Sequence, residues 1–497
     1  MFSGYFSYFV EIVLNGIFMK ENKLFRLLRS LSAEEWNAFE KFTESPYFNN
    51  GRNFLPLFRY LKVSILKKGK ESFEPEVIYD KLYPGKKFNK SVVNTIVSNF
   101  TKLTENFLVQ IEFDSSANPK KLALLKQLNH RNCDSLFEKA AALVSKHARE
   151  TAFDIDTIEF LKGLQENLVR AKYKTNFDKS IENEIHKRSD YRFFVFYLWL
   201  LNEERDLRIM KDVMNKKPAE RISTKLAKSI NPENVISYIE EHYPELKDTV
   251  GAIILYFTSR DIKRVSDSLY KNYLLFQPNL ALTLFYILEG LIVDNITEGR
   301  KEQLAERFRL LRFILEKGLV VNEYQTRLNT RVTENIIYVS FWCKEFSWLK
   351  HFLDTYSSRF AEDMKENLVK YCRACLLFSE KKYAEALREL YLVGDTSITM
   401  KLRMKDLELQ LLFEMNKIDE VYFAIDNYNK LKLNQLVSER HRAAMDLNIS
   451  AYKFLVNLRD AKNPGESAMA AKSLELAPPT QLGDWILEKL KSPVHVS

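Results

Sequence analysis

Cys372 and Cys375 form a CxxC pair, the arrangement in this chain closest to reactive chemistry. Two thiols at this spacing can exchange a disulfide or bind a metal ion. A metal site would need a second ligand pair, and the flanking residues lack the Pro, Gly or Trp of a thioredoxin-like turn. Both thiols instead share a helical stripe with Leu368 and Tyr371. We therefore expect them to be buried in a core, as free cysteines commonly are.

The other residue types that perform catalysis show no useful spacing. The seven histidines are scattered, and none lies in an HExxH or other short metal-binding pattern. The sequence has no GxGxxG or GxxxxGK(S/T) loop of the kind that holds phosphate. Adjacent acids such as Glu203 and Glu204 diverge on a helix and form no catalytic dyad. We predict no catalytic residue, no metal, no cofactor and no enzymatic activity.

A basic cluster near the N-terminus offers a different chemistry. Lys86 and Lys87 lie in the turn "YPGKKFN", and Lys90 and Asn94 follow at the start of the helix predicted for "KSVVNTIVSNFTKL". A helix-turn-helix would place this start in the major groove of duplex DNA. Acidic residues before the turn weaken the positive field, so a solvated helical cap is favoured. DNA binding stays the alternative, and it requires an affinity that falls steeply as salt rises.

Composition favours a large helical protein. A chain of 497 residues exceeds what one hydrophobic core usually serves, so several domains or a repeat array is expected. A hydrophobic fraction of 46% excludes wholesale disorder. Only 13 Gly and 13 Pro leave little turn chemistry for many short strands, which indicates an all-α fold.

Charge and cysteine content say less about the protein than composition does, and they bear on its partners and its compartment. The 75 basic and 66 acidic residues give a formal charge of +9 on a mixed surface, which permits contact with nucleic acid or anionic membrane without demanding it. Four cysteines without disulfide-like density fit a reducing compartment. We expect a bacterial-type cytoplasmic protein.

The pattern along the chain predicts four parts. Residues 1–18 are apolar but lack the basic start and cleavage site of a signal peptide, so we favour Met19 as the natural start. A membrane anchor is the alternative, although the run is short for a span of roughly 20 residues. Residues 19–115 should form a small helical domain, residues 116–460 an α-solenoid, and residues 461–497 a linker with a C-terminal capping helix.

Two local patterns sharpen this outline. Ser32 stands three residues before Glu35, which is the spacing of a helix capping box. Within the predicted solenoid, "SIENEIHKRSDYRFFVFYLWLLNEERDL" (180–207), with its apolar segment at 192–201, is so apolar that it should be buried between neighbouring helices.

An internal repeat is the main signal for architecture. "LLFSEKKYAEAL" (376–387) aligns with "LLFEMNKIDEVY" (411–422) at an offset of 35 residues. "SFWCKEFSWL" (340–349) aligns with the same turn at an offset of 37 residues. A helix-turn-helix unit with a period in the mid-thirties is typical of helical-repeat proteins.

The segment "ACLLFSEKKYAEALREL" resembles a tetratricopeptide repeat. Ala374 and Ala386 are similar to the small residues at which the two helices of a repeat touch, Tyr383 to the aromatic residue near the turn, and Leu390 to the large apolar residue that follows. Lys370 stands where the family often has Trp, and the closing Pro is absent, so the array should be irregular.

The resemblance implies a concave surface that binds a peptide. We therefore expect a protein-protein interaction scaffold or adaptor whose partner is a protein or peptide. A membrane partner is not expected, nucleic acid is the less favoured partner, and the oligomeric state is left open.

Overall fold

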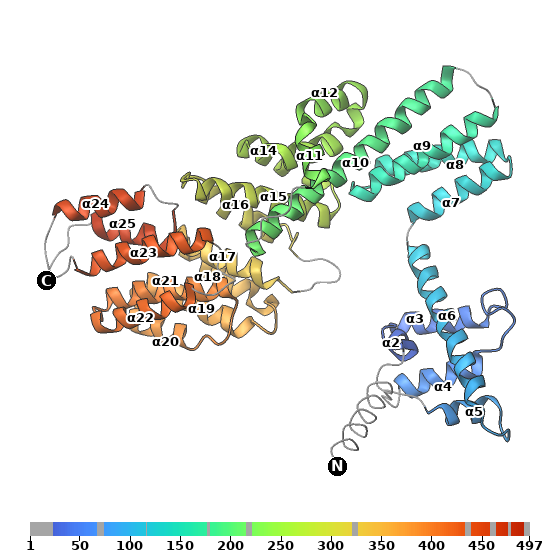
Figure 1. Ribbon diagram of the computed structural model, residues 1–497, viewed down its shortest axis with the longest axis horizontal. Coiled ribbons are helices and arrows are strands. Elements are labelled where there is room, and N and C mark those ends of the chain that lie inside the picture. The colour runs from blue at the N-terminus through green and yellow to red at the C-terminus, as the bar shows by residue number, and fades with distance from the viewer. Residues whose placement is uncertain are drawn as a thin grey trace, which may run out of the picture. The chain divides into compact units, whose positions relative to one another are not determined.

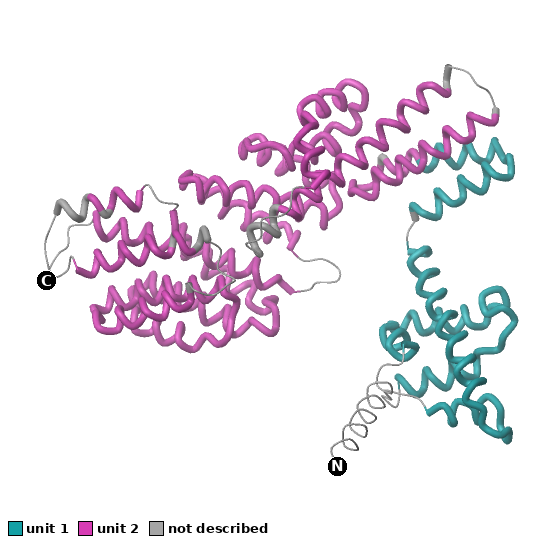
Figure 2. The backbone as a smooth tube through the Cα atoms, in the orientation of Figure 1, with its two compact units in different colours: residues 1–144 teal, residues 145–497 magenta. Residues whose placement is uncertain are grey.

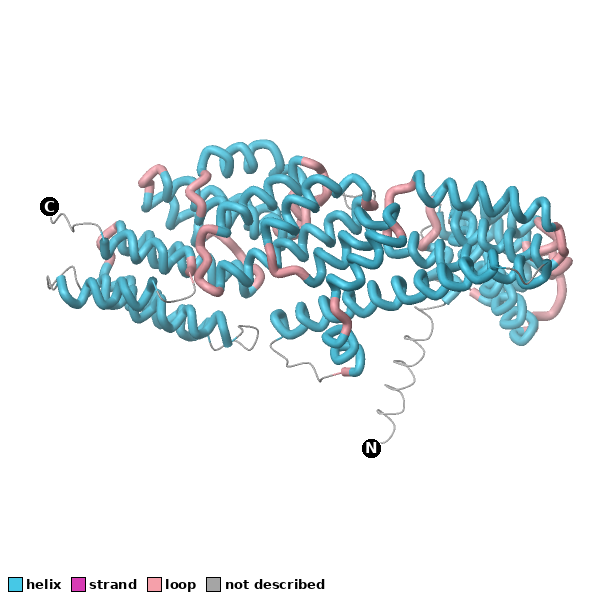
Figure 3. The backbone as a smooth tube through the Cα atoms, turned by 90° about the horizontal axis from the view of Figure 1, so that it is seen from above, coloured by secondary structure: helices cyan, strands magenta, loops and turns pink. Residues whose placement is uncertain are grey.

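The computed structural model describes residues 23–66, 74–115, 117–175, 179–214, 221–320, 327–432, 439–457, 464–475 and 479–491. The chain divides into two compact units, residues 1–144 and residues 145–497 (Figure 2). Within the described ranges the regular elements are helices, and β pairing is limited to isolated bridges (Figure 1, Figure 3). The predicted all-α fold is confirmed. The predictions for residues 1–18 and for a start at Met19 lie outside the described residues.

The helices of the first unit follow one another through short connections. They are α2 (Lys23–Arg29), α3 (Ala33–Glu44), α4 (Leu55–Leu66), α5 (Pro75–Leu82), α6 (Lys90–Ser115) and α7 (Ala117–His130), and α8 (Asp134–Glu150) runs across the division between the units. The predicted end of the N-terminal domain at residue 115 coincides with the end of α6. It stays a prediction.

Local sequence signals explain how α3 begins and ends. The Ser32 hydroxyl accepts from the Glu35 backbone N–H, and the Glu35 carboxylate accepts from the Ser32 N–H at 2.6 Å. This is the predicted capping box, which satisfies two helix N–H groups that lack an intrahelical partner. The helix ends at Glu44, and Ser45 then adopts the extended backbone that Pro46 requires of the residue before it.

Aromatic side chains fill the core of the first unit. Trp36 and Phe39 of α3 are buried against Phe58 of α4, with the Phe39 and Phe58 ring centroids 5.4 Å apart. Phe39 also stacks on Phe107 of α6 at 4.6 Å. Edge-on and offset contacts of this kind stabilise a core beyond the area they bury. The long helix α6 therefore closes the small N-terminal bundle.

The second unit continues as a run of paired helices. They are α9 (Ile155–Thr175), α10 (Lys179–Met214), α11 (Ile222–Ser229), α12 (Pro232–His242), α13 (Ala252–Thr258), α14 (Ile262–Asn272), α15 (Pro278–Thr297), α16 (Gln303–Glu316), α17 (Thr330–Trp342), α18 (Phe346–Tyr356), α19 (Lys365–Ser379), α20 (Tyr383–Tyr391), α21 (Ile398–Glu414), α22 (Ile418–Lys432), α23 (Glu439–Asn457), α24 (Pro464–Glu475) and α25 (Gln481–Lys491). Each helix from α15 to α22 contacts the next one along the chain. An array of helical hairpins follows a small helical N-terminal unit, as the sequence predicted.

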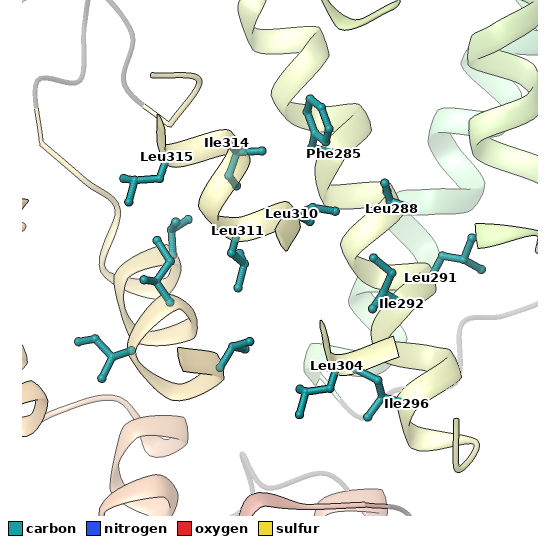
Figure 4. Close-up of a cluster of buried hydrophobic side chains, with 14 of the residues drawn as sticks. Phe285, Leu288, Leu291, Ile292, Ile296, Leu304, Leu310, Leu311, Ile314 and Leu315 are labelled. Atoms are coloured by element: carbon teal, nitrogen blue, oxygen red, sulfur yellow. The ribbon is translucent and has the colours of Figure 1, made fainter. Parts of the chain in front are cut away.

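Helices α15 and α16 show how these hairpins bury apolar surface. Phe285 and Leu288 of α15 and Leu310 and Ile314 of α16 are completely buried between the two helices (Figure 4). Among the described helices, α15 has the length and apolarity that could cross a membrane, and 44% of its most apolar window is buried inside the protein. Much of its apolar surface therefore contacts neighbouring helices.

Three successive hairpins, α17–α18, α19–α20 and α21–α22, share one turn geometry. Lys344, Lys381 and Asn416 occupy equivalent positions with φ of 60°, 61° and 58°, at offsets of 37 and 35 residues. Each donates its N–H to the carbonyl of a phenylalanine three residues earlier, at 3.0–3.1 Å. The next residue donates to a carbonyl five residues earlier, at 2.9–3.0 Å. This is the left-handed helix ending that pairs the last free carbonyls of a helix. The predicted offsets are thus those of a repeated three-dimensional turn.

One prediction for the C-terminal segment, that a linker precedes the capping helix, is wrong in part. Residues 464–475, expected to be linker, form α24, because Pro464 fits a first helical turn and "ESAMAAKSLE" is rich in helix-forming residues. The expected capping helix is present as α25. It contacts α21, α23 and α24, and its Leu482 and Ile486 are completely buried.

Helix α25 also reaches back to distant elements. The Asp484 carboxylate accepts from the indole Nε1–H of Trp342 at 2.6 Å and pairs with Lys301 at 2.9 Å. The buried side chains of Gln410 and Gln481 exchange hydrogen bonds. Such reciprocal pairing satisfies both amides, which would otherwise be costly to bury. Helix α25 therefore ties the ends of α17 and α21 together.

The expectation for the apolar segment 192–201 of α10 is wrong for one side of the helix. Phe194, Tyr197 and Leu198 are buried, but Phe196 and Trp199 are exposed. This segment has apolar side chains on every side of the helix. The spacing of apolar residues therefore does not show which side packs against the core and which side faces solvent.

Candidate functional site

The residues predicted to pack within the repeat lie on α19 and α20. Ala374 on α19 and Ala386 on α20 are completely buried, and Leu390 is 2% exposed. Tyr383 begins α20 and packs on Phe378, with ring centroids 5.7 Å apart. The structure thus gathers all four residues in one hairpin. Small side chains at the two alanine positions allow close approach of the helices.

The CxxC pair lies inside the same hairpin. Cys372 and Cys375 are both fully buried and unbonded. Burial raises the pKa of each thiol well above its ordinary value, because the buried site disfavours the thiolate. Since the thiolate is the reactive form, neither sulfur is suited to redox exchange or metal binding.

An open groove lies beside this hairpin, between α20, α21 and α22. Its volume is about 450 Å³, and it is lined by Tyr391, Glu408, Asp419, Glu420 and Phe423. Tyr391 ends α20, Glu408 lies within α21, and the other three residues stand on the first turns of α22. We call these five residues the α20–α22 groove.

Aromatic side chains form the walls of the α20–α22 groove. Tyr391 is 60% exposed and Phe423 is 70% exposed, values far above those of the aromatic residues in the core. Leu392 and Tyr422 are exposed next to them. Large apolar side chains gathered at one exposed place mark an interaction site more often than isolated ones do.

Three of the five residues that line the groove are acidic, and two of these carboxylates are held by neighbouring side chains. The Tyr391 hydroxyl donates to the Glu408 carboxylate at 3.0 Å, and Lys405 pairs with the other Glu408 oxygen at 2.5 Å. Lys417 pairs with Glu420 at 2.6 Å. Asp419 forms no ion pair with any described residue and is exposed. The groove therefore keeps an excess of negative charge beside its two aromatic side chains.

A polar cluster is recessed among α17, α21 and α22. The Tyr428 hydroxyl of α22 donates to the Asp406 carboxylate of α21 at 2.6 Å. The Arg403 guanidinium lies 4.3 Å from the centre of the Tyr338 ring and donates to Asn335 at 2.8 Å. Burial raises the pKa of Asp406 to about 7, although Tyr428 and Arg403 both favour the ionised form. Asp406 is therefore the group of this cluster that titrates near neutral pH.

This raised pKa predicts a pH-dependent stability. Between the ordinary Asp pKa of 3.8 and about 7, the folded protein binds more protons at Asp406 than the unfolded chain, so stability falls as pH rises through this window. The D406N variant keeps the acceptor for Tyr428 without a charge and should lose this part of the pH dependence. Hydrogen exchange of the α21 amides at about pH 5 and about pH 7.5 measures it. If stability changed equally with pH in D406N and in the unmodified protein, the prediction would be wrong. The control D426N, at an exposed aspartate of α22, should behave like the unmodified protein.

The residues of the DNA-binding alternative lie together in the first unit. Lys86 and Lys87 occupy the turn between α5 and α6, Lys90 begins α6, and Asn94 follows one turn later. All four are exposed, and the Lys86 ammonium lies 5.6 Å from the centre of the Tyr83 ring. The acidic side chains of α5 are exposed beside them. A basic helix start is therefore available to solvent, next to acidic groups.

Sequence reasoning missed the α20–α22 groove. The segment "DEVYFAI" contained an indication of it, namely two aromatic residues on the polar side of a helix. Val421 of α22 is buried, whereas Tyr422 and Phe423 directly after it are exposed. Among the described residues, no group of three or more His, Cys, Asp or Glu side chains could hold a metal ion. The chain matches no protein-family model, no curated protein sequence and no solved structure.

Proposed function

We propose that this chain is a non-enzymatic scaffold or adaptor that binds a short segment of another protein in the α20–α22 groove. The observation that carries the proposal is the groove itself, which is lined by two exposed aromatic side chains and three carboxylates. The proposal requires no cofactor.

A tetratricopeptide-like character of the array supports this function. The turn at Lys344, Lys381 and Asn416 recurs with a period in the mid-thirties. Ala374 and Ala386 supply the small residues that such repeats place between their helices. Arrays of this kind present continuous surfaces built from neighbouring hairpins, and they commonly bind peptides. The groove is formed by residues of two adjacent hairpins, as such a surface requires.

The chemistry of the groove specifies its ligand. A lysine or arginine side chain would pair with Asp419 and Glu420, and a guanidinium would also stack on the Phe423 ring. An aliphatic or aromatic neighbour on the same segment would cover Tyr391. Because the aromatic residues already extend into solvent, they provide anchors without a conformational change. The expected partner segment is therefore basic and apolar at adjacent or alternate positions.

Selection from a displayed library of random peptides, each about 12 residues long, tests the proposal. Enriched peptides should carry Arg or Lys beside an apolar residue, and their affinity should decrease with salt because exposed charges are screened. The F423S and D419K variants should each weaken binding by about tenfold or more, which corresponds to about 1.4 kcal/mol.

Two exposed residues outside the groove give matched controls. L274S removes an exposed apolar side chain, and D354K reverses an exposed carboxylate on α18. Both should bind the selected peptides like the unmodified protein. Enrichment of acidic peptides, or equal binding to the groove variants and to the unmodified protein, would overturn the proposal.

A DNA-binding regulator is the second candidate. The exposed positions of Lys86, Lys87, Lys90 and Asn94 around the start of α6 favour it. Each phosphate contact made by a lysine would release counterions, so binding would weaken steeply with salt. The exposed acids of α5 reduce the local positive potential, and for that reason we place this function second.

A further inference from the structure

Helix α10 carries exposed aromatic side chains on the side opposite its core face. Phe196 is 49% exposed and Trp199 is 45% exposed, whereas Phe194, Tyr197 and Leu198 on the other side are buried. Neighbouring exposed rings on one helix are unusual for a surface that faces only water. Packing of the core therefore does not explain why aromatic side chains lie on the outer face of α10.

The exposed residues of this face follow a regular spacing. They are Ser189, Arg192, Phe196, Trp199, Glu203 and Asp206, and every one is exposed. We call these six residues the α10 stripe. Steps of three and four residues alternate along it, which is the spacing of the seam along which two helices pack in a coiled coil. The aromatic residues stand at its centre, with a basic residue before them and acidic residues after them.

Helix α9 fixes the stripe in position. The Glu166 carboxylate accepts from the Arg192 guanidinium at 3.1 Å, and the Glu159 carboxylate accepts from the Trp199 indole at 2.8 Å. Both stripe side chains are thus oriented before any partner binds, so little conformational freedom is lost on binding. Arg192 remains 54% exposed and has further N–H groups to donate.

We propose that the α10 stripe binds the α10 stripe of a second copy of this chain, in antiparallel orientation. A twofold axis between Phe196 and Trp199 places Phe196 against the partner's Trp199 and Arg192 against the partner's Glu203. It also places Ser189 against the partner's Asp206. Each of these contacts occurs twice, as the symmetry of a two-chain assembly requires.

The charge pattern selects a second copy as the occupant. Arg192 lies towards the N-terminal end of the stripe and Glu203 towards its C-terminal end, so reversing the direction of a second stripe brings these opposite charges together. Asp206 pairs with Arg205 of its own helix at 2.8 Å and adds little to this complementarity. A parallel pairing would place Arg192 against the partner's Arg192 and Glu203 against the partner's Glu203. Like charges in contact disfavour that arrangement. The stripe therefore specifies both the partner and its direction.

The small area of the stripe limits the expected affinity of the dimer. A stable interface usually buries about 1,200 Å² or more in total, and a single helix stripe provides less than this. The dimer should therefore be weak and depend on concentration, with monomer dominant at about 1 µM and dimer accumulating towards about 100 µM. It does not involve the α20–α22 groove, so it stands independently of the proposed function.

Sedimentation velocity of the full chain over this concentration range tests the proposal. The unmodified protein should shift from the mass of one chain towards that of two. F196S, at a side chain that is already half exposed, should weaken dimerisation by about tenfold or more, because an aromatic anchor at the centre of the interface is lost. L274S and F423S, at exposed apolar residues outside the stripe, should dimerise normally.

A charge exchange gives the second and more specific readout. R192E and E203R should each weaken the dimer by several-fold, and the double variant R192E/E203R should recover most of the loss, because it restores opposite charges across the axis. R192E and the double variant both lose the internal pair with Glu166, so their difference reports the contact between chains. A monomer at all concentrations, a dimer insensitive to F196S, or a double variant no tighter than R192E would overturn the proposal. Faster exchange of the α10 amides in F196S, with the same sedimentation behaviour as the unmodified protein, would also overturn it, since another part of the same chain would then cover the stripe.

Discussion

Replacing Trp485 by alanine should lower the stability of the C-terminal hairpins by about 3–5 kcal/mol, the usual cost of removing a buried tryptophan. Trp485 of α25 is 8% exposed, and its ring lies edge-on to Phe413 of α21 at 5.3 Å and stacked on Tyr452 of α23 at 6.2 Å. The substitution leaves a cavity where three helices meet. Helix α25 is therefore expected to act as a structural part of the array.

Hydrogen exchange of the α21 and α23 amides measures this loss locally, which suits a chain with two compact units better than a single unfolding transition. The control M469A changes a side chain of α24 that is 73% exposed and should shift stability by less than about 0.5 kcal/mol. A W485A protein as protected as this control would contradict the role assigned to α25.

Replacing Ala386 by leucine should destabilise the α19–α20 hairpin by about 1–3 kcal/mol, the usual cost of overpacking a core. Ala386 is completely buried, so a larger side chain must push α20 away from its neighbours. The effect should appear as faster exchange of the α19 and α20 amides. It tests whether small residues are needed where the helices of this hairpin approach.

Ala384 provides a control on the same helix. It is exposed, and leucine forms helices nearly as well as alanine, so A384L should leave exchange almost unchanged. If A386L were as stable as A384L, the hairpin would have room for a larger side chain, and the proposed tetratricopeptide-like packing would lose its physical basis.

Local signals in the sequence were sufficient for the parts of the fold that depend on near neighbours. The capping box at Ser32 and Glu35 fixes a helix start through groups three residues apart. The offsets of 35 and 37 residues correspond to the turns at Lys344, Lys381 and Asn416. Each of these features is encoded within one hairpin or one helix turn.

Features that depend on distant segments were not predictable in this way. The Gln410–Gln481 pair and the Trp342–Asp484 bond join residues far apart in the chain, and nothing in their local sequences indicates the partner. The α20–α22 groove was missed for the same reason, because which face of each helix remains open depends on how successive hairpins pack. The outer face of α10 was assigned to the core, since its apolar residues alone do not show which side is covered.

Hydrogen exchange of the full chain with and without a selected basic peptide shows directly whether a partner segment binds in the α20–α22 groove. The peptide should slow exchange only at the end of α20, the middle of α21 and the first turns of α22, around Tyr391, Glu408 and Phe423. The same footprint should disappear in the F423S variant. Protection of α6 or of the α10 stripe, with these three segments unchanged, would show that the peptide does not bind in the groove.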